Sequence, residues 1–208
     1  MMTKVKICGI TNLADALAAC EAGADALGFV LAPEARKRNR YIDADAAAAI
    51  IARLPVLVTT VAVVVNEPLE RLRELLTVFD RLQLHGDESA DICSTLGRRA
   101  FKAFRAGPGL TQDTVAAWPG EACLLDAWSE ESHGGTGARC DWRFAAEAAK
   151  QKKLILAGGL SPENVEEAIL RVRPFAVDAS SSLEASPGKK NHERIRLFIY
   201  NTRKASLA

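Results

Sequence analysis

The sequence predicts an α/β fold, a single-domain (β/α)8 TIM barrel that spans residues 1–208. Three observations support this prediction. Short apolar segments alternate eight times with longer amphipathic segments. The short segments are apolar throughout, as is typical of parallel strands that are covered on both faces. No Pro-, Gly- or Ser-rich linker divides the chain. Eight strand–helix units in about 200 residues favour a closed barrel.

The predicted strands are short runs rich in aliphatic and β-branched residues. In chain order they cover residues 5–8, 26–30, 57–65, 81–84, 100–104, 122–126, 153–157 and 175–178. An open, doubly wound sheet is the alternative arrangement of such strands. The turn after the first strand lacks the G-x-G-x-x-G pattern of that fold, which favours the barrel.

The predicted helices are the Ala- and Leu-rich amphipathic stretches between these strands. In chain order they cover residues 12–22, 43–53, 67–77, 88–96, 111–117, 141–150, 161–172 and 192–204. Gly23 suits the end of the first helix and Pro68 the start of the third. Ser161 and Pro162 are predicted to be the N-cap and first residue of the seventh.

The composition excludes several classes of function. A net charge of +1 gives no electrostatic support for binding nucleic acid or an anionic membrane. The longest apolar run, residues 54–65, is shorter than the roughly 20 residues that span a bilayer, and the chain enters a strand too early for a signal peptide. Five widely spaced cysteines without a Cys-x-x-Cys motif predict neither disulfides nor a zinc site. We therefore expect a cytoplasmic protein with a small-molecule partner.

Polar residues at the carboxyl ends of the strands are the candidate site residues, because active sites of such barrels lie there. Cys8, His85, Asp126 and Asp178 occupy these positions. Cys8 is either a base or nucleophile, if a helix N-terminus or a nearby cation favours its thiolate, or an inert buried thiol. Asp126 follows an apolar run, so it is either a general acid or a structural carboxylate.

Residues 156–163 and the loop after the eighth strand predict a phosphate site. Gly158 and Gly159 allow the backbone to approach a ligand closely, and Ser180 and Ser181 add further backbone donors. The loops after strands seven and eight form the recurrent phosphate site of this fold. Two ordinary strand–helix turns are the alternative.

Two loops supply further candidates. Gly135 and Gly137 belong to the His-Gly-Gly-Thr-Gly segment near Asp126, which either folds over a ligand or is a plain surface loop. Arg40 ends the basic run of residues 36–40 and could pair with a carboxylate.

Eight short segments in order resemble the phosphoribosylanthranilate isomerase family of tryptophan biosynthesis. They are residues 6–11, 23–29, 83–86, 125–127, 134–137, 141–142, 157–160 and 187–188. The resemblance implies an Amadori rearrangement of N-(5-phosphoribosyl)anthranilate to 1-(2-carboxyphenylamino)-1-deoxyribulose 5-phosphate without a cofactor. It implies Asp126 as general acid and Cys8 as general base. A raised pKa would suit the acid and a lowered pKa the base.

The resemblance also implies the substrate-binding residues. Arg40 would grip the anthranilate carboxylate, and the remaining candidates are His85, Gly135, Gly137, Gly158, Gly159, Asp178, Ser180 and Ser181. The chain departs from the family pattern at Ser182, where glycine is usual. If that position needs positive φ, the serine costs about 1 kcal/mol in strain.

Two other functions remain open at this point. One is a related phosphosugar isomerase of histidine biosynthesis, or an enzyme of both pathways, although Cys8 stands where such enzymes are expected to carry an aspartate. The other is a non-catalytic barrel that binds a phosphate ligand, which the presence of both Cys8 and Asp126 disfavours. The sequence leaves monomer and homodimer equally open.

Overall fold

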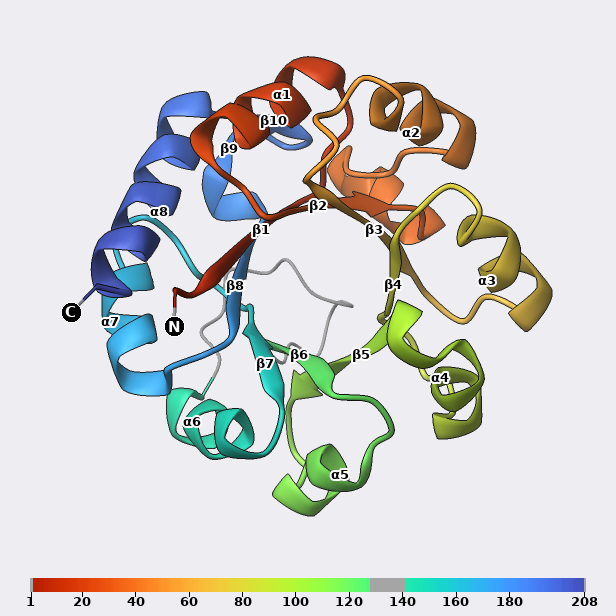
Figure 1. Cartoon of the computed structure of the whole chain (residues 1–208), viewed down its shortest axis with the longest axis vertical. Helices are drawn as coiled ribbons and strands as arrows, with labels where there is room; N and C mark the ends of the chain where they lie inside the picture. Colours follow the sequence, from red (N-terminus) through yellow and green to blue (C-terminus); the bar gives the residue numbers. More distant parts are fainter. Residues whose placement is uncertain (1, 128–140, 208) are drawn as a thin grey trace.

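Eight parallel strands form a closed barrel in the computed structural model of this chain, which describes residues 2–127 and 141–207 (Figure 1). The strands pair in sequence order, and β8 closes the barrel on β1. Their bounds are β1 Lys4–Cys8, β2 Ala26–Val30, β3 Thr59–Val64, β4 Arg81–Leu84, β5 Ala100–Ala106, β6 Ala122–Ala127, β7 Lys153–Leu156 and β8 Ala176–Ala179. The predicted fold class is confirmed.

The helices surround the barrel as an outer ring (Figure 1). They are α1 Leu13–Ala22, α2 Ala44–Ile51, α3 Leu69–Leu75, α4 Ala90–Leu96, α5 Gln112–Ala117, α6 Trp142–Gln151, α7 Val165–Val172 and α8 His192–Ala205. Short 3-10 helices cover Pro33–Arg38, Gly97–Arg99 and Ser181–Leu183. A small hairpin, β9 Glu184–Ser186 and β10 Lys189–Lys190, follows β8. No helix in the described part of the chain is long and apolar enough to cross a membrane.

Side-chain caps fix where several helices begin. Asn12 accepts a hydrogen bond from the Asp15 N–H at the start of α1, and Asp43 does the same for the Ala46 N–H at the start of α2. Gly23 ends α1 with φ +97°, in the left-handed region that favours glycine. The predicted end of the first helix is therefore confirmed.

The protein has two apolar cores, one inside the barrel and one between the barrel and the helices. The smaller core includes Val61, Phe101, Leu124, Ile155 and Ala176, all of which come from strands. Its members fill the barrel interior, while the larger core joins strands to helices. Since side chains alternate along a strand, residues two positions further along point into the same interior.

Several predicted boundaries differ from the structure, those of β3 and α7 among them. β3 begins at Thr59 rather than at residue 57, and Leu57 is 96% exposed in the preceding turn. α7 begins at Val165, because residues 161–164 form a separate turn in which the Asn164 side chain accepts from the Ser161 N–H and donates to the Gly159 carbonyl. Ser161 and Pro162 thus precede the helix. The β9–β10 hairpin was not predicted.

Candidate active site

Three candidate residues point into the barrel at the carboxyl ends of its strands. Asp126 lies two positions beyond Leu124 and Asp178 two positions beyond Ala176, both of which belong to the interior core. Cys8 ends β1 beside Gly28 of β2. All three side chains are buried. The thiol and the two carboxyl groups therefore belong to the same mouth of the barrel, as the sequence predicts.

Cys8 lies among buried charges. The Lys6 ammonium donates to the Asp178 carboxylate at 2.8 Å and lies near the Cys8 sulfur, since a Cβ atom added at Gly28 would be 3.1 Å from the ammonium and 2.7 Å from the sulfur. Burial raises the pKa of the Cys8 thiol above its ordinary value, although Lys6 and Lys190 act to lower it. The expectation of a lowered pKa at Cys8 is therefore wrong, because desolvation of the thiolate outweighs the two cations.

Asp126 lies beside a buried polar pair, Gln83 of β4 and His85 directly after it. Its Oδ2 atom lies 3.6 Å from Nε2 of His85, and Nδ1 of His85 lies 2.7 Å from the Gln83 amide nitrogen. In this arrangement the amide donates to Nδ1, which leaves the ring proton on Nε2, facing Asp126. The His85 ring therefore lies beside the Asp126 carboxyl group, with 3.6 Å between Nε2 and Oδ2.

Arg40 is held by a carboxylate on the hairpin. Its Nε and Nη2 atoms each donate to Glu184 at 2.8 Å, and Glu184 also pairs with Lys190 at 3.1 Å. Burial acts to raise the pKa of Glu184, but hydrogen bonds and charge from Arg40 and Lys190 hold it below its ordinary value. Arg36 instead stacks over the ring of Tyr41, 4.2 Å from its centroid. Arg40 is thus the arginine of the 36–40 run that reaches this buried cluster.

The turns after β7 and β8 offer unused backbone donors. Gly158 and Gly159 have φ of +81° and +68°, which glycine adopts without strain. No hydrogen bond between described residues takes the backbone N–H of Gly158, Gly159 or Ser180. Ser181 begins the short 3-10 helix. These donors fit the predicted phosphate site.

Ser182 does not carry the strain considered above. It lies within the 3-10 helix and is not among the residues with positive φ. Its hydroxyl donates to the Leu160 carbonyl, which ties the turn after β8 to the turn after β7. The serine therefore adds a link between the two turns.

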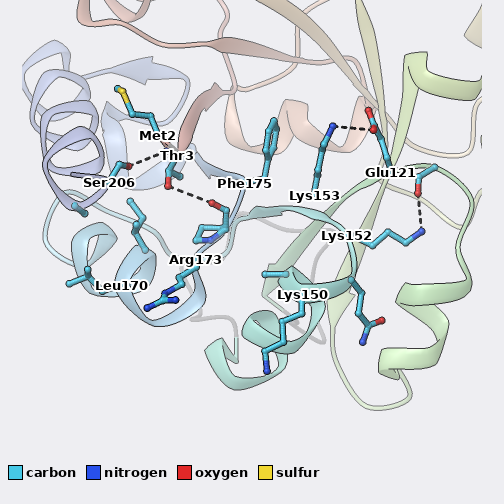
Figure 2. A pocket seen from close by; sticks show the side chains of 16 residues that line it. Met2, Thr3, Glu121, Lys150, Lys152, Lys153, Leu170, Arg173, Phe175 and Ser206 are labelled. Atoms are coloured by element: carbon cyan, nitrogen blue, oxygen red, sulfur yellow. Dashed lines mark hydrogen bonds and ion pairs between the residues drawn. The ribbon is translucent and has the colours of Figure 1, made fainter. Parts of the chain in front are cut away.

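Part of the predicted site lies outside the described residues, namely Gly135, Gly137 and His133. A hollow of about 940 Å³ lies at the opposite, amino end of the strands, lined by residues such as Met2, Glu121 and Phe175 (Figure 2). It does not include Cys8 or Asp126. The candidate chemistry therefore stands apart from this hollow.

The sequence reading missed the charges beneath the mouth. The predicted strand 5–8 includes Lys6, and a lysine two positions before Cys8 must point in the same direction as Cys8. Lys190 and Glu184 lie on the unpredicted hairpin, which Asp15 anchors by accepting from the Lys190 N–H at 2.8 Å. That alternation could have revealed Lys6, whereas no local signal indicates the other two.

Fold and site together define a barrel suited to proton transfer on a phosphorylated small molecule. A family model described as N-(5'-phosphoribosyl)anthranilate (PRA) isomerase matches residues 5–201. A relative of that name from Citrifermentans bemidjiense is 48% identical over 208 residues, which cover 99% of this chain and 100% of the relative. The chain belongs to the N-(5'-phosphoribosyl)anthranilate isomerase family.

Solved structures of the same family have the same fold. Phosphoribosyl anthranilate isomerase from Thermotoga maritima is 39% identical and superposes with a TM-score of 0.87, over 98% of this chain and 100% of that one. A phosphoribosyl anthranilate isomerase in complex with reduced 1-(o-carboxyphenylamino)-1-deoxyribulose 5-phosphate is 38% identical with a TM-score of 0.84 and the same coverage. The neighbours thus include a protein with a phosphorylated ligand bound.

Proposed function

We propose that this chain catalyses the isomerisation for which its family is named, with Asp126 as general acid and Cys8 as general base. The reaction converts N-(5'-phosphoribosyl)anthranilate to 1-(2-carboxyphenylamino)-1-deoxyribulose 5-phosphate. The observation that carries the proposal is the position of the two groups: a thiol from β1 and a carboxyl group from β6 share one barrel mouth. The reaction needs no external oxidant, because the aldose becomes a ketose by internal redox.

In the first step Asp126 gives its proton to the ribose ring oxygen. The bond from that oxygen to C1′ breaks, and the anilino nitrogen supplies the electrons that form a Schiff base. His85 supports this role because its Nε2 faces the Asp126 carboxyl group. It would hold the group in position before transfer and hydrogen-bond to the carboxylate afterwards.

In the second step Cys8 takes the C2′ proton as a thiolate. The electrons of the C2′–H bond move into the Schiff base to give an enolamine, which tautomerises to the ketone product. Because burial raises the pKa of Cys8, only a fraction of the resting enzyme holds the thiolate at neutral pH. A base with a high pKa is also a strong one, and this partly offsets its low population.

The two charged ends of the substrate fit the remaining candidates. We place the phosphate at the backbone N–H groups of Gly158, Gly159 and Ser180, which donate to no described residue. The neighbouring Ser181, which begins the short 3-10 helix, completes this proposed site. We place the anthranilate carboxylate at Arg40, which already binds a carboxylate through two parallel hydrogen bonds.

The other candidates keep lesser roles in the proposal. Asp178 forms an ion pair with Lys6, and in the proposal it acts on the site through this lysine as well as by direct contact with the substrate. His85 faces the substrate beside Asp126. Gly135 and Gly137 remain proposed ligand contacts from the sequence.

The wider setting follows from the same chemistry. We propose one domain over residues 1–208 and a cytoplasmic location, which the unpaired thiols of Cys8, Cys20, Cys93 and Cys123 support. The partner is the phosphorylated substrate, with no nucleic acid or membrane. Monomer and homodimer both fit, and the 96% exposure of Val56 and Leu57 supports the latter.

Two substitutions test the assignment of acid and base. Cys8→Ala and Asp126→Asn should each lower kcat by about 10²- to 10⁴-fold, because each removes one proton-transfer group while keeping the mouth intact. The assay follows the loss of phosphoribosylanthranilate fluorescence. Cys123→Ala is the control, since it removes a buried thiol that points away from the interior on the same strand as Asp126. Turnover near that of the control in either variant would refute the assigned role.

A further inference from the structure

A buried ion pair joins the adjacent strands β1 and β8 on the interior side of the barrel, beneath Cys8. Lys6 of β1 and Asp178 of β8 are register partners, and their charged atoms are 2.8 Å apart. The Lys6 side chain is 4% exposed and that of Asp178 is 10% exposed. A pair this deeply buried brings little net stability, because desolvation of both ions offsets their attraction. Its presence at the mouth therefore calls for a functional explanation.

The Lys6 ammonium lies near the Cys8 sulfur and is bonded to Asp178. Lys6 and Cys8 lie two residues apart on β1 and point into the same interior. A Cβ atom added to Gly28 would lie 2.7 Å from the Cys8 sulfur and 3.1 Å from Lys6 Nζ, so both atoms crowd one point above that glycine. Glycine at position 28 thus leaves room for the sulfur and the ammonium to lie near one another.

The other charges that face Cys8 make Lys6 the more effective cation. Lys190 approaches from the hairpin, but its Nζ is bound to Glu184 at 3.1 Å and to the Ser180 carbonyl at 3.1 Å. Arg40 is fully engaged by the same Glu184 through two hydrogen bonds. Asp178 opposes a negative charge on the sulfur, and its own charge is balanced by Lys6.

We propose that Lys6 is a positioning residue for Cys8: Asp178 fixes its ammonium against the sulfur, and the ammonium stabilises the thiolate that accepts the substrate proton. This inference rests on the proposed function, in which Cys8 is the base. In the step itself the C–H bond breaks, the proton joins the sulfur, and the electron pair stays with the substrate. The Lys6 proton is not transferred, so charge is conserved within the site.

The titration behaviour of both groups agrees with this geometry. Burial alone would lower the pKa of Lys6, but Asp178 and the Cys8 thiolate outweigh it and raise that pKa, so Lys6 stays charged at working pH. Burial is the main cause of the raised pKa of Cys8, and Lys6 is the first of the groups that counteract it. Without Lys6 the thiolate would be rarer still.

The test is the pH dependence of Cys8 alkylation by iodoacetamide, read at that residue by peptide mass spectrometry. Lys6→Met should move the alkylation midpoint up by at least about one pH unit, which reduces the thiolate fraction at neutral pH about tenfold. Lys6→Arg keeps the positive charge and should shift the midpoint less. The acid limb of kcat/KM should move with the alkylation midpoint, whereas a purely structural role would lower the plateau without moving the limb.

A second variant keeps the test valid if Lys6→Met fails to fold, since that change leaves Asp178 buried without its partner. Lys6→Met/Asp178→Asn removes both charges together. Its midpoint should lie between those of the parent and of Lys6→Met, because the opposing carboxylate is lost as well. A midpoint equal to that of the parent in either variant would overturn the proposal.

The chain offers a matched control in another buried ion pair. Lys102 and Glu88 are 2.9 Å apart, with 6% and 1% of their side chains exposed, and Lys102 points out of the barrel between β5 and α4. Lys102→Met/Glu88→Gln removes a comparable pair away from Cys8 and should leave the Cys8 midpoint unchanged. A shift of the same size in this control would show that loosening the fold moves the midpoint, which would also overturn the proposal.

Failure of this inference and failure of the proposed function give different results. The alkylation readout does not depend on turnover. Normal activity in Cys8→Ala would reject Cys8 as the base while leaving the coupling between Lys6 and Cys8 measurable. An inactive Cys8→Ala together with an unshifted Lys6→Met midpoint would reject the role of Lys6 alone.

Discussion

Adding one methyl group at Gly28 should disable the site while the barrel persists. In Gly28→Ala the new Cβ would meet the Cys8 sulfur at 2.7 Å, Lys6 Nζ at 3.1 Å and the Cys8 Cα atom at 3.2 Å. The ammonium at the end of a flexible stem can move away, but the sulfur sits on a short side chain and the Cα belongs to the paired strand β1. The sulfur must therefore rotate or the strands must separate slightly.

The expected cost follows from this overpacking. Inserting a carbon into a filled interior typically costs 1–3 kcal/mol, so we expect Gly28→Ala to lower the free energy of unfolding in urea by about 2 kcal/mol. Gly28 is not among the glycines with positive φ, so the loss would come from contact rather than from backbone strain. Displacing the base by about 1 Å should lower kcat by about 10²-fold.

Gly120→Ala serves as the control for the loss of stability. Gly120 has φ +93° and nothing within 4 Å of an added Cβ, so alanine there strains the backbone without contacting another side chain. It lines the hollow at the amino end of the strands, away from Cys8. We expect a loss of about 1–2 kcal/mol with normal kcat. Equal kcat in Gly28→Ala and Gly120→Ala would refute the claim that the space above Gly28 positions the thiol.

Two further predictions follow from titration. Glu163 pairs with Arg194 and is 60% exposed, and hydrogen bonds from Arg194 lower its pKa to about 2. A lowered pKa gives its full stabilisation above the unfolded pKa and loses it as the pH falls through the folded pKa. The parent should therefore exceed Glu163→Gln in unfolding free energy by at most about 1 kcal/mol at pH 6, and this difference should vanish as the pH falls towards 2. Burial raises the pKa of Cys123 to about 11, so native protein should resist iodoacetamide at that residue at pH 8, whereas urea-unfolded protein should react; rapid native labelling at Cys123 by mass spectrometry would contradict this.

The sequence predicts those parts of the site that depend on strand ends. Cys8 and Asp126 end apolar runs, and the barrel geometry alone brings such ends to one mouth. Gly158 and Gly159 can likewise be singled out from the sequence, because turns with positive φ and turns that bind phosphate both favour glycine. Local patterns therefore bring out Cys8, Asp126 and the turns after β7 and β8 as candidates, whose roles in the reaction stay predictions.

The electrostatics of the site could not be predicted in the same way. The pairs Lys6–Asp178 and Arg40–Glu184 join residues 172 and 144 positions apart, and only closure of the barrel brings them together. The direction of the Cys8 pKa shift depends on a balance between burial and two cations, which no local pattern reports. The sequence suggests a lowered pKa for the base, whereas burial raises the pKa of Cys8.

The arrangement at Arg40 explains how an anionic substrate could enter a mouth that is already full of charge. Arg40 and Lys190 share the carboxylate of Glu184, so neither cation is buried without a counter-ion in the unliganded protein. An incoming carboxylate would replace one oxygen of Glu184 at Arg40, while Glu184 keeps its bond to Lys190. Such an exchange of partners avoids the large penalty of burying a lone charge at either stage. If Arg40 binds the substrate carboxylate as proposed, Glu184 holds it ready, and the affinity of the site reflects the difference between two similar ion pairs rather than the full strength of one.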